Sequence, residues 1–243
     1  DHWGLLGSQT ALYIQDAAKG AYRKGSLGEI GGVDTYMSQN VPVHTVGVAT
    51  GTPKIDGANQ NVAYSTVKDT GTQSLVTKGW TNSTTGILKK GDVFTIAGVY
   101  AVNPVTKEKL AFLKQFVVKA DADSGASTGP ATLTISPPII KDGAFQNVSA
   151  APADNADITV LGAGGTGYRQ NMVFNSKAFA LVSVPLVSPP GAVDVSRQTY
   201  KGTSVRVIPV YDGVNDVSSW RLDILYGVKT IDPRLAHRIS GTA

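Results

Sequence analysis

Two neighbouring stretches near the carboxyl end have the pattern of paired β-strands: Thr203-Ser-Val-Arg-Val-Ile-Pro-Val-Tyr211 and Val217-Ser-Ser-Trp-Arg-Leu-Asp-Ile-Leu-Tyr226. In the second stretch, large apolar residues alternate with Arg221 and Asp223, the period of two that is typical of a strand with one buried face. The alternation predicts that four side chains point into a core: Trp220, Leu222, Ile224 and Tyr226.

Turn-forming residues bound this predicted hairpin. Asp212-Gly213 begins the connection, where glycine is expected because it accepts the positive φ of a tight turn. Pro233 cannot donate a ladder hydrogen bond, so the strand that contains Tyr226 should end before it.

The composition is that of a β-rich globular protein. The 243 residues are 42% hydrophobic and 16% charged, with 27 Gly and 12 Pro, which is too apolar for a disordered chain. Lys and Arg number 22 against 18 Asp and Glu, and these charges are dispersed, so a nucleic-acid-binding arm is not indicated. The absence of cysteine excludes disulfides, thiolate metal sites and cysteine nucleophiles. No apolar run reaches transmembrane length and no signal peptide is recognised, while the start at Asp1 suggests a processed or truncated product.

A helix and a block of short strands are predicted upstream of the hairpin. Small apolar residues at helical spacing predict a helix from Ser8 to Lys24. Two stretches rich in glycine and small polar residues, Thr50 to Gln60 and Gly162 to Gly167, are predicted to be linkers, the second of them flexible. Short runs with strand character between the linkers favour a small closed or sandwiched β domain. These predicted strands are Gln73 to Lys78, Asp92 to Val102, Leu110 to Lys119, Ala131 to Ser136 and Ile158 to Leu161.

The sharpest enzyme-like motif is Gly162-Ala-Gly-Gly-Thr-Gly167, which fits G-x-G-x-x-G after a predicted strand. A dinucleotide site also needs a helix at the last glycine and an acidic residue about 20 positions further on. Residues 168 to 187 contain no Asp or Glu, and Asp194 is the first. We therefore interpret the motif as a linker and predict no cofactor-binding residue.

The histidines and paired aspartates do not form a recognisable metal or catalytic pattern. His2, His44 and His237 each lack a second ligand at metal spacing, so packing or surface roles are expected. Asp121 and Asp123 lack the ligand series of a calcium loop and are expected in a solvated turn, as are Asp154 and Asp157. We predict no catalytic, cofactor or metal site.

Several sequence runs occur in a definite order: Ala21-Tyr-Arg-Lys-Gly-Ser26, Ile30-Gly-Gly-Val-Asp34, Asn40-Val-Pro-Val-His-Thr45, Lys89-Lys-Gly-Asp-Val-Phe-Thr-Ile-Ala-Gly-Val99 and Trp220-Arg-Leu-Asp-Ile-Leu-Tyr-Gly-Val228. In this order they resemble the major capsid (coat) proteins of tailed bacteriophages. The resemblance is to the Hong Kong ninety-seven fold, in the short-tailed-phage branch with an inserted β-barrel domain. The chain is similar to the carboxyl-terminal portion of such a protein.

The resemblance implies an α+β, β-rich fold that combines apical and peripheral capsid elements with a small inserted antiparallel β-barrel. It implies that residues 1–50 and 166–243 form the capsid core, which comprises the apical domain and part of the peripheral domain. Residues 51–165 would form the inserted barrel.

The resemblance also implies a structural, non-enzymatic function without cofactors. The subunit would assemble with copies of itself into pentamers and hexamers of an icosahedral phage or prophage head that encloses double-stranded DNA. Scaffolding protein, portal and DNA bound without sequence specificity would be partners, and no membrane would be involved. Assembly would take place in the bacterial cytoplasm, and the product would be the virion capsid.

The alternative function is a β-rich adhesin or carbohydrate-binding module, which would need clustered exposed aromatic residues. In the resembling family an amino-terminal arm, an extended loop and a long spine helix precede the apical domain and knit the shell together. We expect none of them in this chain, and therefore expect the 243-residue form to be a monomer or weak oligomer that forms no shells.

Overall fold

The computed structural model describes residues 26–30, 32–36, 38–192 and 194–240. The helix predicted from Ser8 to Lys24 lies outside these residues. The chain divides into two compact units, residues 1–170 with 241–243 and residues 171–240. Each unit is described by itself.

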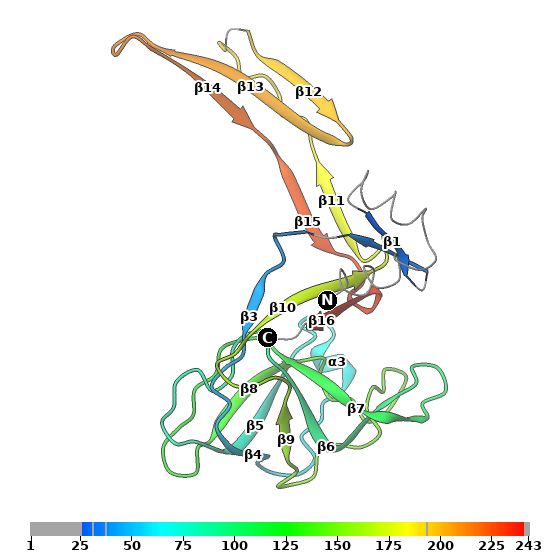
Figure 1. Ribbon diagram of the computed structural model, residues 1–243. Helices are drawn as coiled ribbons and strands as arrows, with labels where there is room; N and C mark the ends of the chain where they lie inside the picture. Colours follow the sequence, from blue (N-terminus) through cyan, green and yellow to red (C-terminus); the bar gives the residue numbers. More distant parts are fainter. Residues whose placement is uncertain (1–25, 31, 37, 193, 241–243) are drawn as a thin grey trace, which may run out of the picture. The chain divides into compact units, whose positions relative to one another are not determined.

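Six antiparallel strands of the first unit form a nearly closed barrel (Figure 1). The strands are β4 (Gly51–Ile55), β5 (Gln73–Trp80), β6 (Val93–Val102), β7 (Lys109–Val118), β8 (Ala131–Ser136) and β9 (Ile158–Val160). They are paired in the order β4-β5-β8-β7-β6-β9. A bridge between Lys54 and Asp157 joins the two outer strands, and the amide of Ile55 donates to the carbonyl of Ala156 at 3.0 Å. The predicted small β domain is confirmed, and β5 to β9 lie close to the predicted strand runs.

Alternation along the barrel strands places one side-chain set in a continuous core. In β5, Gln73, Leu75 and Thr77 are buried while the residues between them are exposed. Its neighbour β8 repeats this pattern with Ala131, Leu133 and Ile135. Because successive side chains of a strand point to opposite faces, both patterns put the larger apolar residues on the inside. Burial of this set from water is the main stabilising term for the unit.

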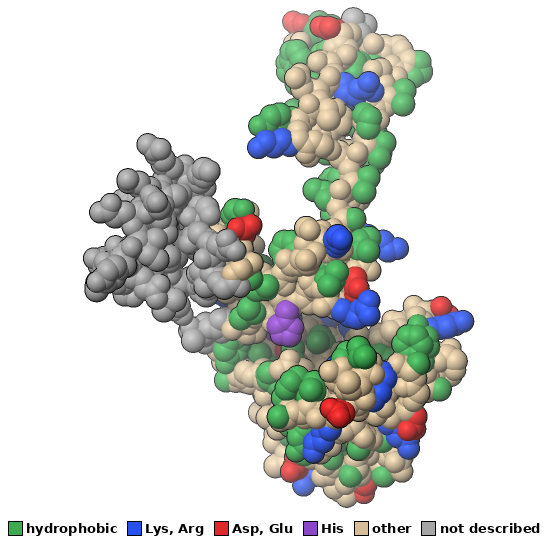
Figure 2. Space-filling view, turned by 90° about the vertical axis from the view of Figure 1, so that its right-hand side faces the viewer, with side chains coloured by type: hydrophobic (Ala, Val, Ile, Leu, Met, Phe, Trp, Pro, Cys, Tyr) green, Lys and Arg blue, Asp and Glu red, His purple; other side chains and the backbone are tan. Residues whose placement is uncertain are grey.

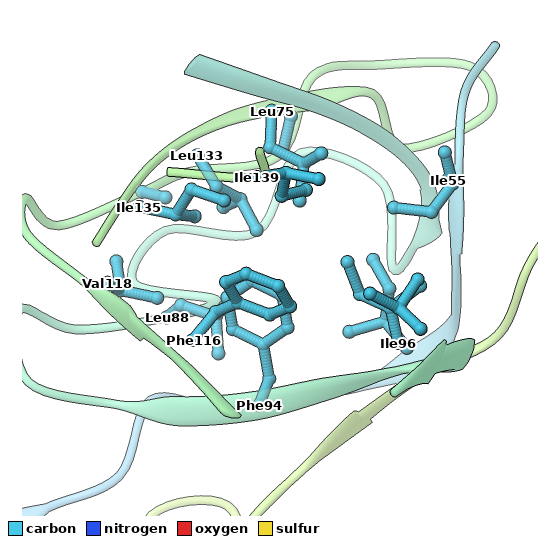
Figure 3. Close-up of a cluster of buried hydrophobic side chains, with 14 of the residues drawn as sticks. Ile55, Leu75, Leu88, Phe94, Ile96, Phe116, Val118, Leu133, Ile135 and Ile139 are labelled. Atoms are coloured by element: carbon cyan, nitrogen blue, oxygen red, sulfur yellow. The ribbon is translucent and has the colours of Figure 1, made fainter. Parts of the chain in front are cut away.

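Two aromatic rings lie in the middle of this core (Figure 3). Phe94 of β6 and Phe116 of β7 have ring centroids 5.8 Å apart and both are fully buried. Apolar residues from the surrounding strands and turns enclose the pair. These include Ile55, Leu75, Leu88, Ile96, Val118, Leu133, Ile135 and Ile139.

The stretch from Thr50 to Gln60, predicted to be a linker, contains strand β4. Its residues Gly51 and Ile55 pair with Trp80 and Thr77 of β5, with an irregular register between Gly51 and Lys54. The prediction was wrong because Gly, Thr and Pro are common in linkers, whereas here they occupy an outer strand, where proline is tolerated.

The remaining elements of the first unit are short. Strands β1 (Ser26–Ile30) and β2 (Val33–Tyr36) form a hairpin, and α3 (Tyr64–Val67) is a single helical turn. Strand β3 (Val43–Thr45) pairs with the first residues of β10 (Gly167–Phe174), with Gly167 opposite Thr45 and Arg169 opposite Val43. In the sequence, β3 therefore precedes the barrel strands and β10 follows them.

The second unit consists of small antiparallel sheets. Its elements after β10 are β11 (Phe179–Ser183), β12 (Ser196–Tyr200), β13 (Thr203–Asp212), β14 (Val217–Asp223), β15 (Tyr226–Thr230), the 3-10 turn η1 (Pro233–Leu235) and β16 (Ala236–Ser240). Strands β12, β13 and β14 form one sheet, and β11 pairs with β15. The predicted hairpin is confirmed, and β15 ends before Pro233 as expected.

The predicted buried face of this hairpin is wrong. Trp220 is 68% exposed and Leu222 69%, and Ile224 and Tyr226 are also exposed. Ile208, 7% exposed, pairs with Arg221, and paired residues share a sheet face. The better covered face is therefore the one that carries Asp223, whose side chain is 13% exposed, although the side chain of Arg221 on the same face is 67% exposed. Strand β14 also ends at Asp223, so the alternation does not continue into Ile224.

The turn of the hairpin differs in detail from the prediction. Residues 213–216 form the turn, and the positive φ belongs to Asp216, at 53°, rather than to Gly213. The Asp212 side chain accepts a hydrogen bond from the Val214 amide at 3.0 Å, as in an Asx turn. Asp212 thus supplies the side-chain contact of the turn, and Asp216 supplies its left-handed residue.

Candidate functional site at the barrel junction

The glycine run at residues 162–167 does not have the context of a dinucleotide site. Strand β10 begins at Gly167, where a helix would be required. A Cβ on Gly164 would lie 2.1 Å from the carbonyl oxygen of Val48, and Gly162 has a φ of +97°. The run is therefore a closely packed return turn. Glycine is needed here for close backbone approach and not for phosphate binding.

The structure brings together His44, Gly47, Lys89 and Asp92 at the junction between β3 and the barrel. Asp92 is 1% exposed and lies immediately before β6. Its Oδ1 lies 2.6 Å from Nε2 of His44. Its Oδ2 accepts hydrogen bonds from the amides of Gly47 at 3.0 Å and Lys89 at 2.7 Å. Because a carboxylate only accepts, His44 donates through Nε2, and the Asp92 side chain ties residues 44–47 to the turn of residues 89–92.

Backbone hydrogen bonds hold residues 46–49, the incoming segment, on two sides. On one side the amides of Val48 and Ala49 donate to Gly86 and Ile87 at 3.0 and 2.9 Å. On the other side Val46 donates to Thr166 at 3.1 Å. A Cβ on Gly47 would lie 2.6 Å from the carbonyl oxygen of Ile87, so this position also requires glycine.

Three of the four aspartates that were expected in solvated turns accept hydrogen bonds from backbone amides. Asp121 accepts from the Lys90 amide at 2.7 Å, and Asp123 accepts from the Gly86 amide at 2.6 Å. Asp154 accepts from the Gly57 amide at 2.9 Å, and this hydrogen bond, followed by the charge of Lys78, lowers the pKa of its carboxyl. Within the described residues there is no cluster of three or more His, Cys, Asp or Glu that could hold a metal ion.

Sequence reasoning missed the contact between His44 and Asp92. His44 was considered in isolation and Asp92 was noted as part of the Lys-Lys-Gly-Asp turn. The two residues are 48 positions apart, so no local spacing rule connects them. Of the other histidines, His237 is exposed in β16, and His2 lies outside the described residues.

A second charged group is held within the sheet of β12, β13 and β14. Asp223 accepts from Arg206 Nη2 at 2.6 Å and from Arg221 Nε at 2.7 Å. The hydrogen bonds from Arg206 and then Arg221 lower the pKa of the Asp223 carboxyl. Arg206 also donates to the carbonyl of Val187. These partners are all internal, so the cluster is a structural cross-link of the sheet.

No helix in the described part of the chain is both long and apolar enough to cross a membrane.

Comparison with known proteins agrees with the resemblance found in the sequence. A family model described as the P22 coat protein, gene protein 5, matches residues 7–239. The major capsid protein of Acyrthosiphon pisum secondary endosymbiont phage 1 is 26% identical over 254 aligned residues, which cover 99% of this chain and 59% of the relative. Among solved structures, the CUS-3 coat protein I-domain is 29% identical and matches 46% of this chain and 96% of its own, with a TM-score of 0.31. Since the family model spans almost all of its length, the chain belongs to the P22 coat protein family, a family of phage coat proteins.

Proposed function

We propose that this chain is part of a major capsid protein subunit that assembles with copies of itself into pentamers and hexamers of an icosahedral head around double-stranded DNA. The observation that carries the proposal is the family match over residues 7–239. The chain spans about three-fifths of the curated relative, 59% of its length, so the proposal concerns the complete subunit that contains it.

We also propose that the subunit consists of two structural parts. We assign residues 51–165 to an inserted barrel domain and residues 1–50 and 166–243 to the capsid core. Support comes from the continuous buried core of the barrel strands. The strands outside the barrel expose many large apolar side chains, among them Leu181, Trp220, Leu222 and Val228. Such surfaces are typical of chains that are completed by other segments or subunits.

Surface charge is consistent with this structural function. Figure 2 shows hydrophobic side chains and charges of both signs scattered over the sheet of β12 to β14 and over the barrel alike. We propose scaffolding protein and portal as assembly partners and contact with packaged DNA that is independent of sequence. Assembly would occur in the bacterial cytoplasm, with the virion capsid as the final location and no membrane involved.

Assembly can be tested with the complete gene product that contains this chain. Co-expression with the scaffolding protein of the same phage should give closed shells in negative-stain electron microscopy and a fast-sedimenting species. A matched variant with Phe94→Asp in the barrel core should give no shells, because a buried unpaired charge prevents that domain from folding. If the folded, complete protein stays monomeric at micromolar concentration with scaffold present, the proposal fails.

We also propose that the chain binds no enzymatic cofactor. Titration calorimetry with dinucleotides should show no heat of binding, because the return turn carries none of the context that such a site needs. Micromolar affinity for a dinucleotide would contradict the structural function independently of the assembly experiment.

A further inference from the structure

Residues 46–50 and 161–166 connect the barrel to strands β3 and β10. Chains with inserted domains commonly have flexible connections at the insertion points. The sequence suggests such connections here, because both crossing points are rich in glycine. The contacts at the junction instead favour a rigid connection, since they combine a buried ionisable side chain, close backbone packing and a strand ladder.

Asp92 is the centre of these contacts because its carboxylate accepts hydrogen bonds both from its own turn and from the segment that leads into the barrel. Lys89 belongs to the turn before β6, Gly47 to the incoming segment, and His44 to β3. Removing the imidazole would leave Oδ1 of a carboxylate that is 1% exposed without its hydrogen-bond donor. Leaving a buried charged acceptor unpaired is costly, so the pair strongly favours the docked position of β3.

The return side of the junction is fixed to the same place. Tyr168 of β10 pairs with His44 in the strand ladder, and its hydroxyl accepts a hydrogen bond from the amide of Ala163 at 2.8 Å. The ladder continues to a hydrogen bond of 3.0 Å from the Gln170 amide to the Pro42 carbonyl. The contact that holds β3 on the barrel therefore also holds β10, through the ladder.

We propose that the pair of His44 and Asp92 is a latch that fastens β3 and β10 to the barrel, so that residues 42–170 behave as one rigid body. The glycine-rich crossing points then provide close packing rather than flexibility. Any joint at which the barrel can change direction lies before Pro42 and after Gln170. His44 and Asp92 are positioning residues in this scheme, and the inference holds whether or not the chain forms shells.

Rigidity can be measured directly in the unaltered chain by residual dipolar couplings. The amides of residues 43–45 and 167–169 should fit the same alignment tensor as the amides of β5 and β8. This measurement does not depend on any variant being stable. If the ladder amides of the unaltered chain require a different tensor, the proposal is overturned.

Variants then test whether the latch causes the rigidity. His44→Ala should raise hydrogen exchange of the Gly47 and Gln170 amides by roughly tenfold or more, the effect of losing a hydrogen bond to a charged group. Exchange at Leu75 and Leu133 in the barrel core should not change. His44→Gln, which keeps a side-chain N–H donor, should restore much of the protection. His237→Ala, at an exposed histidine, is the matched control and should have no effect.

The outcomes separate a latch from a general packing contribution. If His44→Ala leaves the junction amides as protected as before, the ladder alone holds the strands and the latch does not exist. If it accelerates exchange equally throughout the barrel, His44 contributes to global stability only, and the proposal is again contradicted.

Discussion

Buried polar side chains of the barrel find partners within the described structure in several places. Trp80 donates through Nε1 to the hydroxyl of Thr77 at 2.9 Å, and Thr77 donates to the carbonyl of Ala131 at 2.8 Å. Gln73 accepts from the Ile139 amide through its Oε1 at 2.8 Å. These contacts allow polar residues at inward positions of β5, because a buried polar group is tolerated when it is hydrogen-bonded.

Lys114 of β7 is different, because burial lowers the pKa of its ammonium. Within the described part of the chain this ammonium has no hydrogen-bond or ion-pair partner. Lys114→Met should therefore raise the melting temperature at pH 7, since an apolar side chain of similar length carries no desolvation cost. Lys109→Met is the control: Lys109 lies 3.7 Å from the ring centroid of Tyr100, and its loss should not stabilise. Calorimetry of both variants would decide, and a lower melting temperature for Lys114→Met would contradict the prediction.

In the unit of residues 171–240, Asp232 should make the stability depend on pH. Hydrogen bonds from the side chain and then the backbone amide of Arg234 lower the pKa of the Asp232 carboxyl to about 2. Because the folded pKa lies below the ordinary value of 3.8, the stabilisation is present above pH 3.8 and is lost as the pH falls towards 2. NMR titration of the carboxyl carbon should show this low midpoint. Arg234→Leu should move it upwards, whereas Arg221→Leu, which removes a partner of Asp223, should not.

At the scale of elements, turns and strands of this chain depend on different constraints. The return turn requires residues without side chains because two backbone segments meet there. Strand β14 keeps its hydrogen bonds to β13 although its large apolar residues are exposed. Ladder pairing and the contact between Asp223 and Arg206 therefore hold this strand, without burial of the face that the alternation selected.

The return turn should be sensitive to a single methyl group. Gly164→Ala would place a Cβ 2.1 Å from the Val48 carbonyl oxygen and should lower the free energy of unfolding by about 1 to 3 kcal/mol. Gly227→Ala is the control, because a Cβ at that position meets no atom within 4 Å. Denaturant unfolding should show the difference, and equal stability of the two variants would mean that the turn can shift.

Leu133 and Leu222 test whether side chains of the barrel and of the sheet of β12 to β14 differ in burial. Leu133 of β8 is 0% exposed, so Leu133→Ala should cost about 2 to 5 kcal/mol of unfolding free energy. Leu222 of β14 is 69% exposed, so Leu222→Ala should change it by less than about 0.5 kcal/mol. Urea unfolding followed by fluorescence would measure both. A large cost at Leu222 would show that this face is covered in solution.

At the scale of the whole molecule, buried apolar residues are concentrated in one of the two units. Most of the buried hydrophobic residues belong to the barrel and its turns. In residues 171–240, Ala178 and Ile208 are the buried hydrophobic residues among those described. Because burial is the main stabilising term, the two units should differ in stability.

Hydrogen exchange should reveal this difference in the intact chain. Amides of β5 and β8 should exchange more slowly than those of β13 and β14 by roughly two orders of magnitude, because strands with few buried contacts open locally. Mass spectrometry with peptide resolution is sufficient. Similar protection in both units would mean that the apolar surface of the second unit is covered, and a concentration series would then show whether self-association covers it.

The strand runs of the barrel could be predicted from the sequence because their signal is local. Alternating residues such as Leu75 and Thr77, or Leu133 and Ile135, face the same side of a strand in any protein. Turn residues between the runs set their ends. The order of the runs along the chain likewise identified the family without knowledge of any contact.

Contacts between distant segments could not be predicted in this way. Alternation shows that β14 has two faces, but only the packing of the folded sheet determines that the face of Ile208 is covered and that of Trp220 is not. Nor does a glycine-rich run show whether its backbone is solvated or packed, as Gly164 is against Val48. The pairing of His44 with Asp92 arises only when β3 is brought beside the turn before β6, because burial and hydrogen bonding depend on distance in space and not on position in the chain.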